Sequence, residues 1–268
     1  SELFVILGFI TAIVGFILAL AQKDIKLLLA YSTVSQIGVI MIGINLGNPE
    51  AYWGGIYHLM NHAIFKSTLF LTAGMIISEY QTRNLDEING VFKHMPAVGV
   101  ATILSILGII GAPLFNGSIS KYLIASGSNG TWIEYGLILI NLGTIVVFIK
   151  YGQLLFGISG KKETADSDIL ERAVVLTLSI LCFIGGILGS ELIVILFNID
   201  LIVDLWSYGM KMLIFAGSLF LGTLIYRGLF KKTNRLAFIH SFELGFNEIC
   251  LLITLFFAFM VAYLKLTL

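Results

Sequence analysis

Eight long apolar runs dominate this sequence and limit what it can fold into. A helix of roughly 20 residues crosses the hydrocarbon core of a bilayer, which is about 30 Å thick. The eight runs reach about that length, and they cover residues 2–22, 27–47, 56–78, 97–127, 133–156, 173–197, 208–226 and 246–268. The short alternating segments of a membrane β-barrel are absent. The sequence therefore predicts an all-α integral membrane protein with about eight transmembrane helices.

The composition excludes several other classes of protein. Hydrophobic residues make up 58% of the chain and charged residues 12%, about half the charged share of a soluble domain. This excludes a soluble globular protein, a disordered chain and a nucleic-acid binder. Residues 3–22 are too long for the core of a signal peptide, so we expect a membrane helix there.

Basic residues between the apolar runs are confined to alternate loops. The second, fourth and sixth loops, the last of them around Asp200, contain none. The first, third, fifth and seventh loops contain Lys23, Lys26, Arg83, Lys93, Lys161, Lys162, Arg172, Arg227, Lys231, Lys232 and Arg235. By the positive-inside rule, these charged loops face the cytoplasm and both termini face outward across the plasma membrane.

The run at 97–127 is too long for one straight crossing. It is interrupted by Gly111, Pro113, Asn116 and Gly117. Proline removes a backbone donor and clashes with the preceding turn, so we expect a broken helix over Pro113–Gly117. Discontinuous helices recur in ion-coupled transporters, although a proline kink without function is the alternative.

Several ionisable side chains fall inside apolar runs, where a charge costs at least ~2.5 kcal/mol. Lys66, Lys121 and Lys150 are the buried lysines that we expect. His58, His62 and Lys66 follow the spacing i, i+4, i+8, which places them on one face of a helix. Histidine and a desolvated lysine both exchange protons near neutral pH, so this stripe is a candidate proton relay.

Other interpretations of these groups remain open. The two histidines could bind a metal, but the glutamate of a zincin motif is missing between them. The stripe could also be a structural polar cluster, and Lys150 could reach the nearest loop. We expect Lys211 to reach a membrane surface, and the acidic residues other than Glu191, including Glu134, to lie at interfaces.

The sequence carries no signature of catalysis. Cys182 and Cys250 both lie in apolar runs, which excludes a disulfide framework, a zinc cluster and cysteine-ligated iron–sulfur. Nucleotide-binding and phosphate-binding glycine motifs are missing, as is a Ser/His/Asp order. We expect no cofactor and no bond-making chemistry in this chain.

Three stretches together resemble a known family. They are the segments 21–38 (AQKDIKLLLAYSTVSQIG), 58–74 (HLMNHAIFKSTLFLTAG) and 113–121 (PLFNGSISK). In this order they resemble the antiporter-like subunits shared by respiratory complex I, Mrp sodium/proton antiporters and membrane-bound hydrogenase-type complexes. The resemblance covers roughly residues 5–160.

The resemblance implies a role in ion transport linked to redox chemistry or to an ion gradient. Lys121 falls where the family carries a proton-exchanging lysine or glutamate in a broken helix. His58, His62 and Lys66 fall on its central chain of buried polar groups, and we expect Lys150 to belong to the same relay. Asn116-Gly117 and the segment 148–152 resemble the hydrogenase and sulfur-reductase branch. Partners would then be other antiporter-like and small membrane subunits. A peripheral redox module, which could be linked to ferredoxin, would hold iron–sulfur clusters or a nickel–iron centre.

Family members are built from two inverted repeats, and this chain resembles the second repeat together with the helices after that repeat. We expect residues 1–160 to form that antiporter-like repeat and 161–268 to form helices that pack against partner subunits. The chain is then either a naturally half-length subunit or part of a longer one, such as a complex I subunit. A scaffold without its own ion path and a stand-alone transporter are the rival functions.

Overall fold

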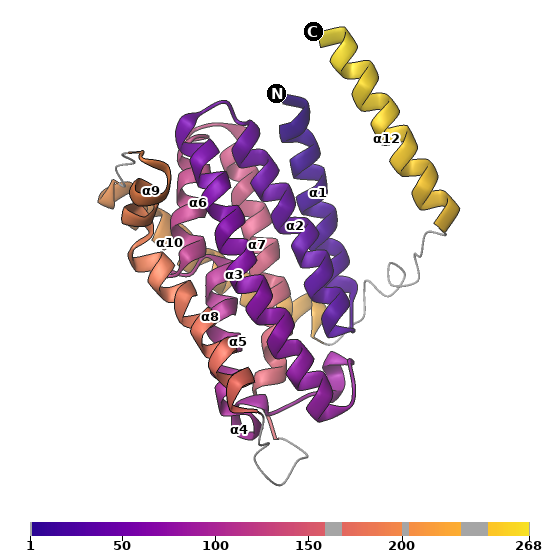
Figure 1. The fold of residues 1–268 in the computed structure, drawn as a ribbon, viewed down its shortest axis with the longest axis vertical. Coiled ribbons are helices and arrows are strands. Elements are labelled where there is room, and N and C mark those ends of the chain that lie inside the picture. The colour runs from indigo at the N-terminus through magenta and orange to yellow at the C-terminus, as the bar shows by residue number, and fades with distance from the viewer. Residues whose placement is uncertain (1, 159–167, 200–203, 232–245, 268) are drawn as a thin grey trace. The chain divides into compact units, whose positions relative to one another are not determined.

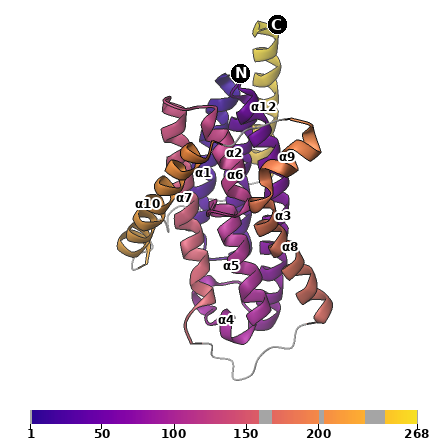
Figure 2. The ribbon, with the colours of Figure 1, turned by 90° about the vertical axis from the view of Figure 1, so that its left-hand side faces the viewer.

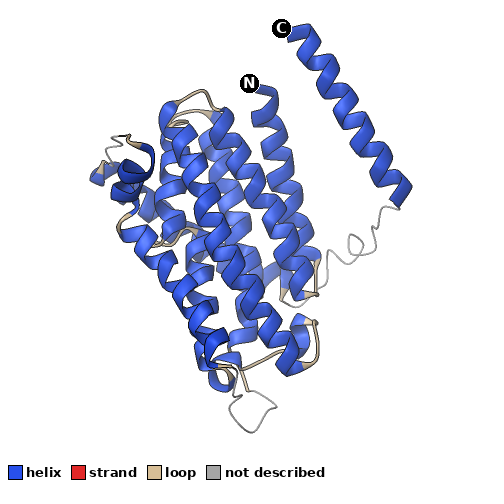
Figure 3. Ribbon diagram, viewed as in Figure 1, coloured by secondary structure: helices blue, strands red, loops and turns tan. Residues whose placement is uncertain are grey.

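The computed structural model describes residues 2–158, 168–199, 204–231 and 246–267. These residues form helices joined by turns and contain no β-strand (Figure 3). The helical elements are α1 (Glu2–Ala21), α2 (Ile25–Asn45), α3 (Pro49–Tyr80), η1 (Leu85–Glu87), α4 (Val91–His94), α5 (Pro96–Ile110), α6 (Asn116–Ser126), α7 (Trp132–Gly152), η2 (Gln153–Leu155), α8 (Ile169–Ile187), α9 (Gly189–Phe197), α10 (Leu205–Ile225), the π-helical turn η3 (Tyr226–Phe230) and α12 (Phe246–Thr267).

The chain divides into two units, residues 1–234 and residues 235–268. The described part of the second unit is the single helix α12. The basic residues Lys161, Lys162, Lys232 and Arg235, which helped to sort the loops, lie outside the described residues, as does Asp200.

Membrane-spanning character is visible in the described helices. Five segments are long and apolar enough to cross a bilayer, namely Glu2–Ala21, Ile25–Asn45, Trp132–Leu155, Ile169–Ile187 and Trp206–Phe230. The apolar helix α5 and the apolar stretch Ile253–Tyr263 are shorter than a crossing requires. The predicted all-helical membrane fold is confirmed at this level, and the number of eight crossings stays a prediction.

Helix α3 packs against several helices of the first unit on one side, and its other side, with Leu59, Met60 and Leu71, is exposed. It contacts α2, α5, α6 and α8, while α7 contacts α1, α2, α5 and α10 (Figures 1 and 2). The stripe His58, His62 and Lys66 lies on the packed side of α3. Its position explains how a polar stripe can be buried within a largely apolar molecule.

The termini of α3 explain why it is longer than the apolar run at 56–78. The Asn48 side chain accepts hydrogen bonds from the backbone N–H groups of Glu50 and Ala51, and Pro49 occupies the first helical turn. Both features favour a helix start. At the other end, Gln81 takes a left-handed conformation with φ of 57° and ends the helix.

The apolar run predicted at 173–197 is two helices in the structure, α8 and α9, which meet at Leu188. Gly185, Gly186 and Gly189 surround this junction and have low helix propensity. A Cβ atom at Gly186 would overlap the carbonyl oxygen of Leu114. The junction therefore lies against the segment that links α5 to α6, a contact that sequence spacing does not reveal.

The loop after α3 is fixed by polar contacts. Lys23 and Asp86 form an ion pair at 2.7 Å, and the backbone N–H of Leu85 donates to the Lys23 carbonyl at 2.8 Å. The Thr82 hydroxyl and the Asn84 amide donate to Glu87, and these hydrogen bonds lower the pKa of its carboxyl. These contacts tie the first and third loops together.

Candidate ion-handling site

The helix break predicted at Pro113–Gly117 is observed between α5 and α6. Gly111 follows α5 with φ of 76°, a conformation that glycine adopts without strain. Its backbone N–H donates to the Gly108 carbonyl at 3.1 Å, and Ala112 N–H donates to the Leu107 carbonyl at 2.9 Å. These bonds satisfy two carbonyls of the last turn of α5, where the helix ends.

Gly117 allows the two halves of the broken helix to approach closely. A Cβ atom built on Gly117 would overlap the carbonyl oxygen of Gly108. Any other residue would therefore push α6 away from α5. The side-chain amide of Asn116 beside it is fully buried, and neither its oxygen nor its nitrogen has a hydrogen-bond partner among the described residues.

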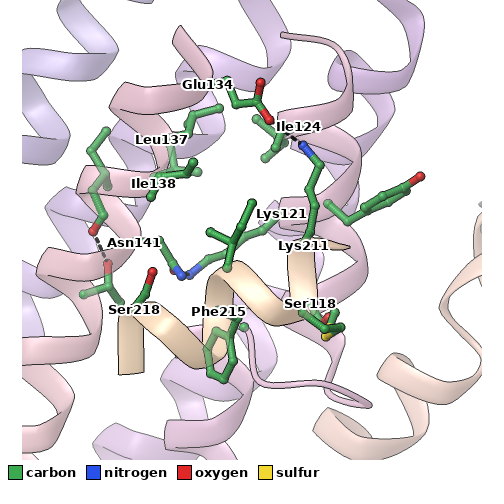
Figure 4. A pocket seen from close by; sticks show the side chains of 18 residues that line it. Ser118, Lys121, Ile124, Glu134, Leu137, Ile138, Asn141, Lys211, Phe215 and Ser218 are labelled. Carbon is green, nitrogen blue, oxygen red and sulfur yellow. Dashed lines mark hydrogen bonds and ion pairs between the residues drawn. The ribbon is translucent and has the colours of Figure 1, made fainter. Parts of the chain in front are cut away.

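Lys121 extends from α6 toward the end of α5. Its Nζ donates to the carbonyl of Ile109 at 2.7 Å and to Asn141 Oδ1 at 2.7 Å (Figure 4). The Ile109 carbonyl lies in the last turn of α5. Because the helix ends there, this carbonyl has no helical N–H group to accept from. The ammonium therefore lies at the negative end of the α5 dipole, where a cation is stabilised.

His58 is fully buried and joins four helices through hydrogen bonds. Its Nδ1 lies 2.8 Å from Ser120 Oγ, and its Nε2 lies 3.0 Å from Gln36 Oε1. The Gln36 amide nitrogen then donates to Thr144 Oγ1 at 3.2 Å. These four residues, here called the His58 link, come from α6, α3, α2 and α7. With both ring nitrogens engaged, His58 has no free nitrogen for a metal ion in this arrangement.

Lys66 occupies a separate polar position between α3 and α2. Its Nζ donates to the Leu29 carbonyl at 2.8 Å and to Ser32 Oγ at 2.5 Å. The Phe148 ring lies beneath the ammonium at 5.6 Å, which permits a cation–π interaction. Only 5% of Lys66 is exposed, so its amine depends on these contacts for its polar partners.

The remaining predicted residues are less connected. His62 is buried, and its Nε2 has no hydrogen-bond partner among the described residues. Lys150 Nζ donates to the carbonyls of Leu20 at 2.7 Å and Gln22 at 2.6 Å. Lys150 therefore caps the end of α1. Because His62 Nε2 has no partner in the described part of the chain, the His58–Lys66 stripe is not one continuous chain of hydrogen bonds in this structure.

An ion pair that the sequence did not predict lines the same cavity as Lys121. Lys211 Nζ, on α10, lies 3.0 Å from Glu134 Oε1 on α7. From the sequence, Glu134 and Lys211 lie near the ends of different helices, and each is expected at the membrane surface by itself. Only the packing of α10 against α7 brings them together, and no local sequence signal predicts that packing.

Lys121, Glu134 and Lys211 line one cavity of about 100 Å³ (Figure 4). The polar side chains of Asn141, Thr144, Ser118 and Ser218 line it too. The Lys121 cavity, as we call it, therefore contains one end of the His58 link, Thr144. A cavity of this size has room for several water molecules, and its polar walls offer them partners.

These features define a helical membrane protein in which a partly buried lysine lies at a helix break. Residues 1–148 match the family model described as NADH:quinone oxidoreductase/Mrp antiporter, transmembrane. The match covers more than half of the chain, which therefore belongs to this family of antiporter-like membrane subunits. The expected resemblance is confirmed.

Individual relatives point to the same kinds of assembly. Formate hydrogenlyase subunit 3 of Escherichia coli is 31% identical in an alignment of 216 residues, and the match covers 70% of this chain and 36% of that protein. A chain in the Mrp complex of Dietzia sp. DQ12-45-1b matches with a TM-score of 0.64 and 20% identity, covering 88% of this chain and 48% of that one. A chain of the archaeal membrane-bound sulfane sulfur reductase matches with a TM-score of 0.67 and 21% identity, covering 81% of this chain and 43% of that one.

The structural matches, at these identities, show the fold alone. This chain spans 39% and 36% of the length of the first two curated relatives that it matches. Those relatives therefore contain a large part that has no counterpart here.

Proposed function

We propose that this chain is an ion-translocating membrane subunit of a multi-subunit, redox-driven complex of the hydrogenase, sulfur-reductase or Mrp type. Its polar relay consists of Lys121, Lys66, His62, His58 and Lys150, and it carries protons or exchanges them with sodium. Partner membrane subunits complete the ion path, and a peripheral module with iron–sulfur clusters or a nickel–iron centre supplies the driving reaction. The basic loops face the cytoplasm, and residues 161–268 pack against the partners.

The His58 link is the observation that carries this proposal. Gln36 Oε1 accepts from His58 Nε2, because the other end of the amide donates to Thr144. Neutral His58 therefore accepts at Nδ1 from the Ser120 hydroxyl. Protonated His58 instead donates to that oxygen, and the hydroxyl turns to the carbonyl of Asn116 or Gly117 at 3.3 Å. His58 keeps its partners in both charge states, as a proton relay requires.

The driving force in this mechanism is electrostatic. Charges repel one another strongly where the dielectric constant is low. A proton that arrives at one buried group therefore favours deprotonation of the next, so the groups titrate as a coupled set. Charge movement in a neighbouring subunit would start this sequence at Lys66 or Lys121.

A scaffold is the second candidate, and one observation favours it. Lys66, Lys121 and Lys150 all donate to backbone carbonyl groups. Such contacts also stabilise helix ends and close packing without any ion movement. Under this alternative, substitutions of these lysines reduce the amount of assembled complex, but each assembled complex behaves normally.

Removing His58 and Gln36 tests the His58 link. His58→Ala and Gln36→Ala should each lower ion uptake per electron transferred, because each breaks the same path. The double variant should be little worse than the more impaired single variant, as for residues that share one network. The measurement is ion uptake by vesicles that contain the complex, with assembled complex quantified on native gels.

His94→Ala is the matched control for this cycle. His94 is also a buried histidine, 5% exposed, but its Nε2 pairs with Glu79 at 2.7 Å, apart from the His58 link. Its loss should leave uptake per assembled complex unchanged. Additive effects of the two link variants, or normal uptake in both, would contradict the proposed link.

The purified chain alone should not exchange ions in proteoliposomes. Its buried cations need neighbouring subunits to complete a path through the membrane, since intramembrane charges depend on such partners. The assay is a pH-sensitive dye inside the liposomes, with the intact complex as the positive control. Rapid cation/proton exchange by the chain alone would favour a stand-alone transporter instead.

A further inference from the structure

The Glu134–Lys211 ion pair lies at the boundary between the Lys121 cavity and the surface. The side chains of Lys211 and Glu134 are 18% and 19% exposed, and both also line the cavity. In Figure 4 the Lys211 amine meets the Glu134 carboxylate at one end of the cavity, and the Lys121 amine lies beside Asn141 away from this pair. The ion pair thus contacts both the cavity and the outside.

The same pair is anchored to the turn that joins α6 to α7. Glu134 Oε2 accepts the backbone N–H of Gly130 at 2.8 Å, and Lys211 Nζ also donates to Asn129 Oδ1 at 3.0 Å. Asn129 and Gly130 are exposed residues of that turn. The contacts place the carboxylate where water at the turn can reach it.

Lys121 and Glu134 line the same cavity. Hydroxyl groups of Ser118, Thr144 and Ser218 lie along its walls, and it has room for water between them. Lys121 donates to Asn141 within this space. Water molecules in this cavity can pass a proton between the two side chains by successive hydrogen-bond exchange.

We propose that Glu134 is the group through which Lys121 exchanges protons with the solution at the α6–α7 turn, and that Lys211 positions it. This inference rests on the proposed function. The Lys121 ammonium loses a proton to water in the cavity, and the Glu134 carboxylate accepts one from it. The neutral carboxyl group is held less strongly by Lys211, releases its proton to water at the turn and re-forms the ion pair. Lys121 is then free to accept the next proton.

Three variants of the assembled complex test this assignment. Glu134→Gln keeps the shape and can still accept the Gly130 hydrogen bond, but it cannot exchange a proton. We expect proton uptake per electron to fall by about tenfold or more. The double variant Glu134→Lys with Lys211→Glu returns a carboxylate to the same pair from the other helix, and it should recover a large part of the uptake. Glu50→Gln is the control, because it changes an exposed carboxylate in the first turn of α3 that does not line the cavity, and it should have no effect.

Lys121→Ala, measured in parallel, separates this inference from the proposed function. Normal uptake in Lys121→Ala would overturn the proposed function itself. Reduced uptake in Lys121→Ala with normal uptake in Glu134→Gln would overturn only the role of Glu134. If Glu134→Gln assembles poorly, the charge-swapped variant decides: uptake that stays low in fully assembled swapped complex would also overturn it.

Discussion

The complex that carries Lys121→Ala should assemble but lose most of its coupled ion uptake, by about tenfold or more. The substitution removes the one ammonium that bonds both the end of α5 and Asn141 across the cavity. Lys121→Glu should retain more uptake than Lys121→Ala, because a carboxyl group can also take and release a proton. The measurement is the initial rate of ion uptake by membrane vesicles, divided by the amount of assembled complex.

The effect of Lys121→Ala on assembly must be separated from its effect on ion uptake. The alanine variant leaves the Ile109 carbonyl without its donor, which costs about 1–3 kcal/mol, so a moderate loss of assembled complex is expected. Lys93→Ala removes an exposed lysine from the end of α4 and should change neither assembly nor uptake. Full uptake per assembled Lys121→Ala complex would support the scaffold instead.

Gly117→Ala should severely reduce the amount of assembled complex. The added methyl group would overlap the carbonyl oxygen of Gly108, so α6 must move away from α5. Overpacking of this kind costs about 3 kcal/mol or more where backbone blocks the methyl group. The measurement is the yield of complex on native gels together with its melting temperature in detergent.

Gly74→Ala is the matched control for Gly117→Ala. Gly74 lies in α3, and a Cβ atom there meets no atom within 4 Å. This change should be neutral or stabilise the helix by about 0.5–1 kcal/mol, because alanine loses less backbone entropy. If Gly117→Ala assembled as well as Gly74→Ala, the close approach of α5 and α6 would be wrong.

The sequence predicted the positions of helices and of the helix break better than it predicted the contacts between helices. Hydrophobic run length located the described helices, and Pro113 with its neighbouring glycines located the break between α5 and α6. The junction between α8 and α9 was missed, although the glycines around Leu188 are a local signal of low helix propensity. The close approach of Gly186 to the distant Leu114 has no such signal in the sequence.

The candidate site shows the same limit. The spacing of His58, His62 and Lys66 correctly placed them on one buried helix, yet the side chains that bond His58 come from α2 and α6. Sequence position places Glu134 and Lys211 separately at interfaces, although they are each other's partners. Residues 77 positions apart carry no mutual signal in a single sequence. The helical repeat of 3.6 residues predicts which side chains share a face of one helix. Which helices pack together, and therefore which side chains meet between them, is known only from the three-dimensional structure.

The ratio of ions taken up to electrons transferred, in proteoliposomes that contain the intact complex, tests the central claim most directly. It should be compared between wild type and Lys121→Ala under equal electron flow, so that a slower driving reaction cannot imitate lost transport. We expect the ratio to fall sharply in Lys121→Ala while electrons still flow. An unchanged ratio in fully assembled Lys121→Ala complex would contradict ion translocation through this chain.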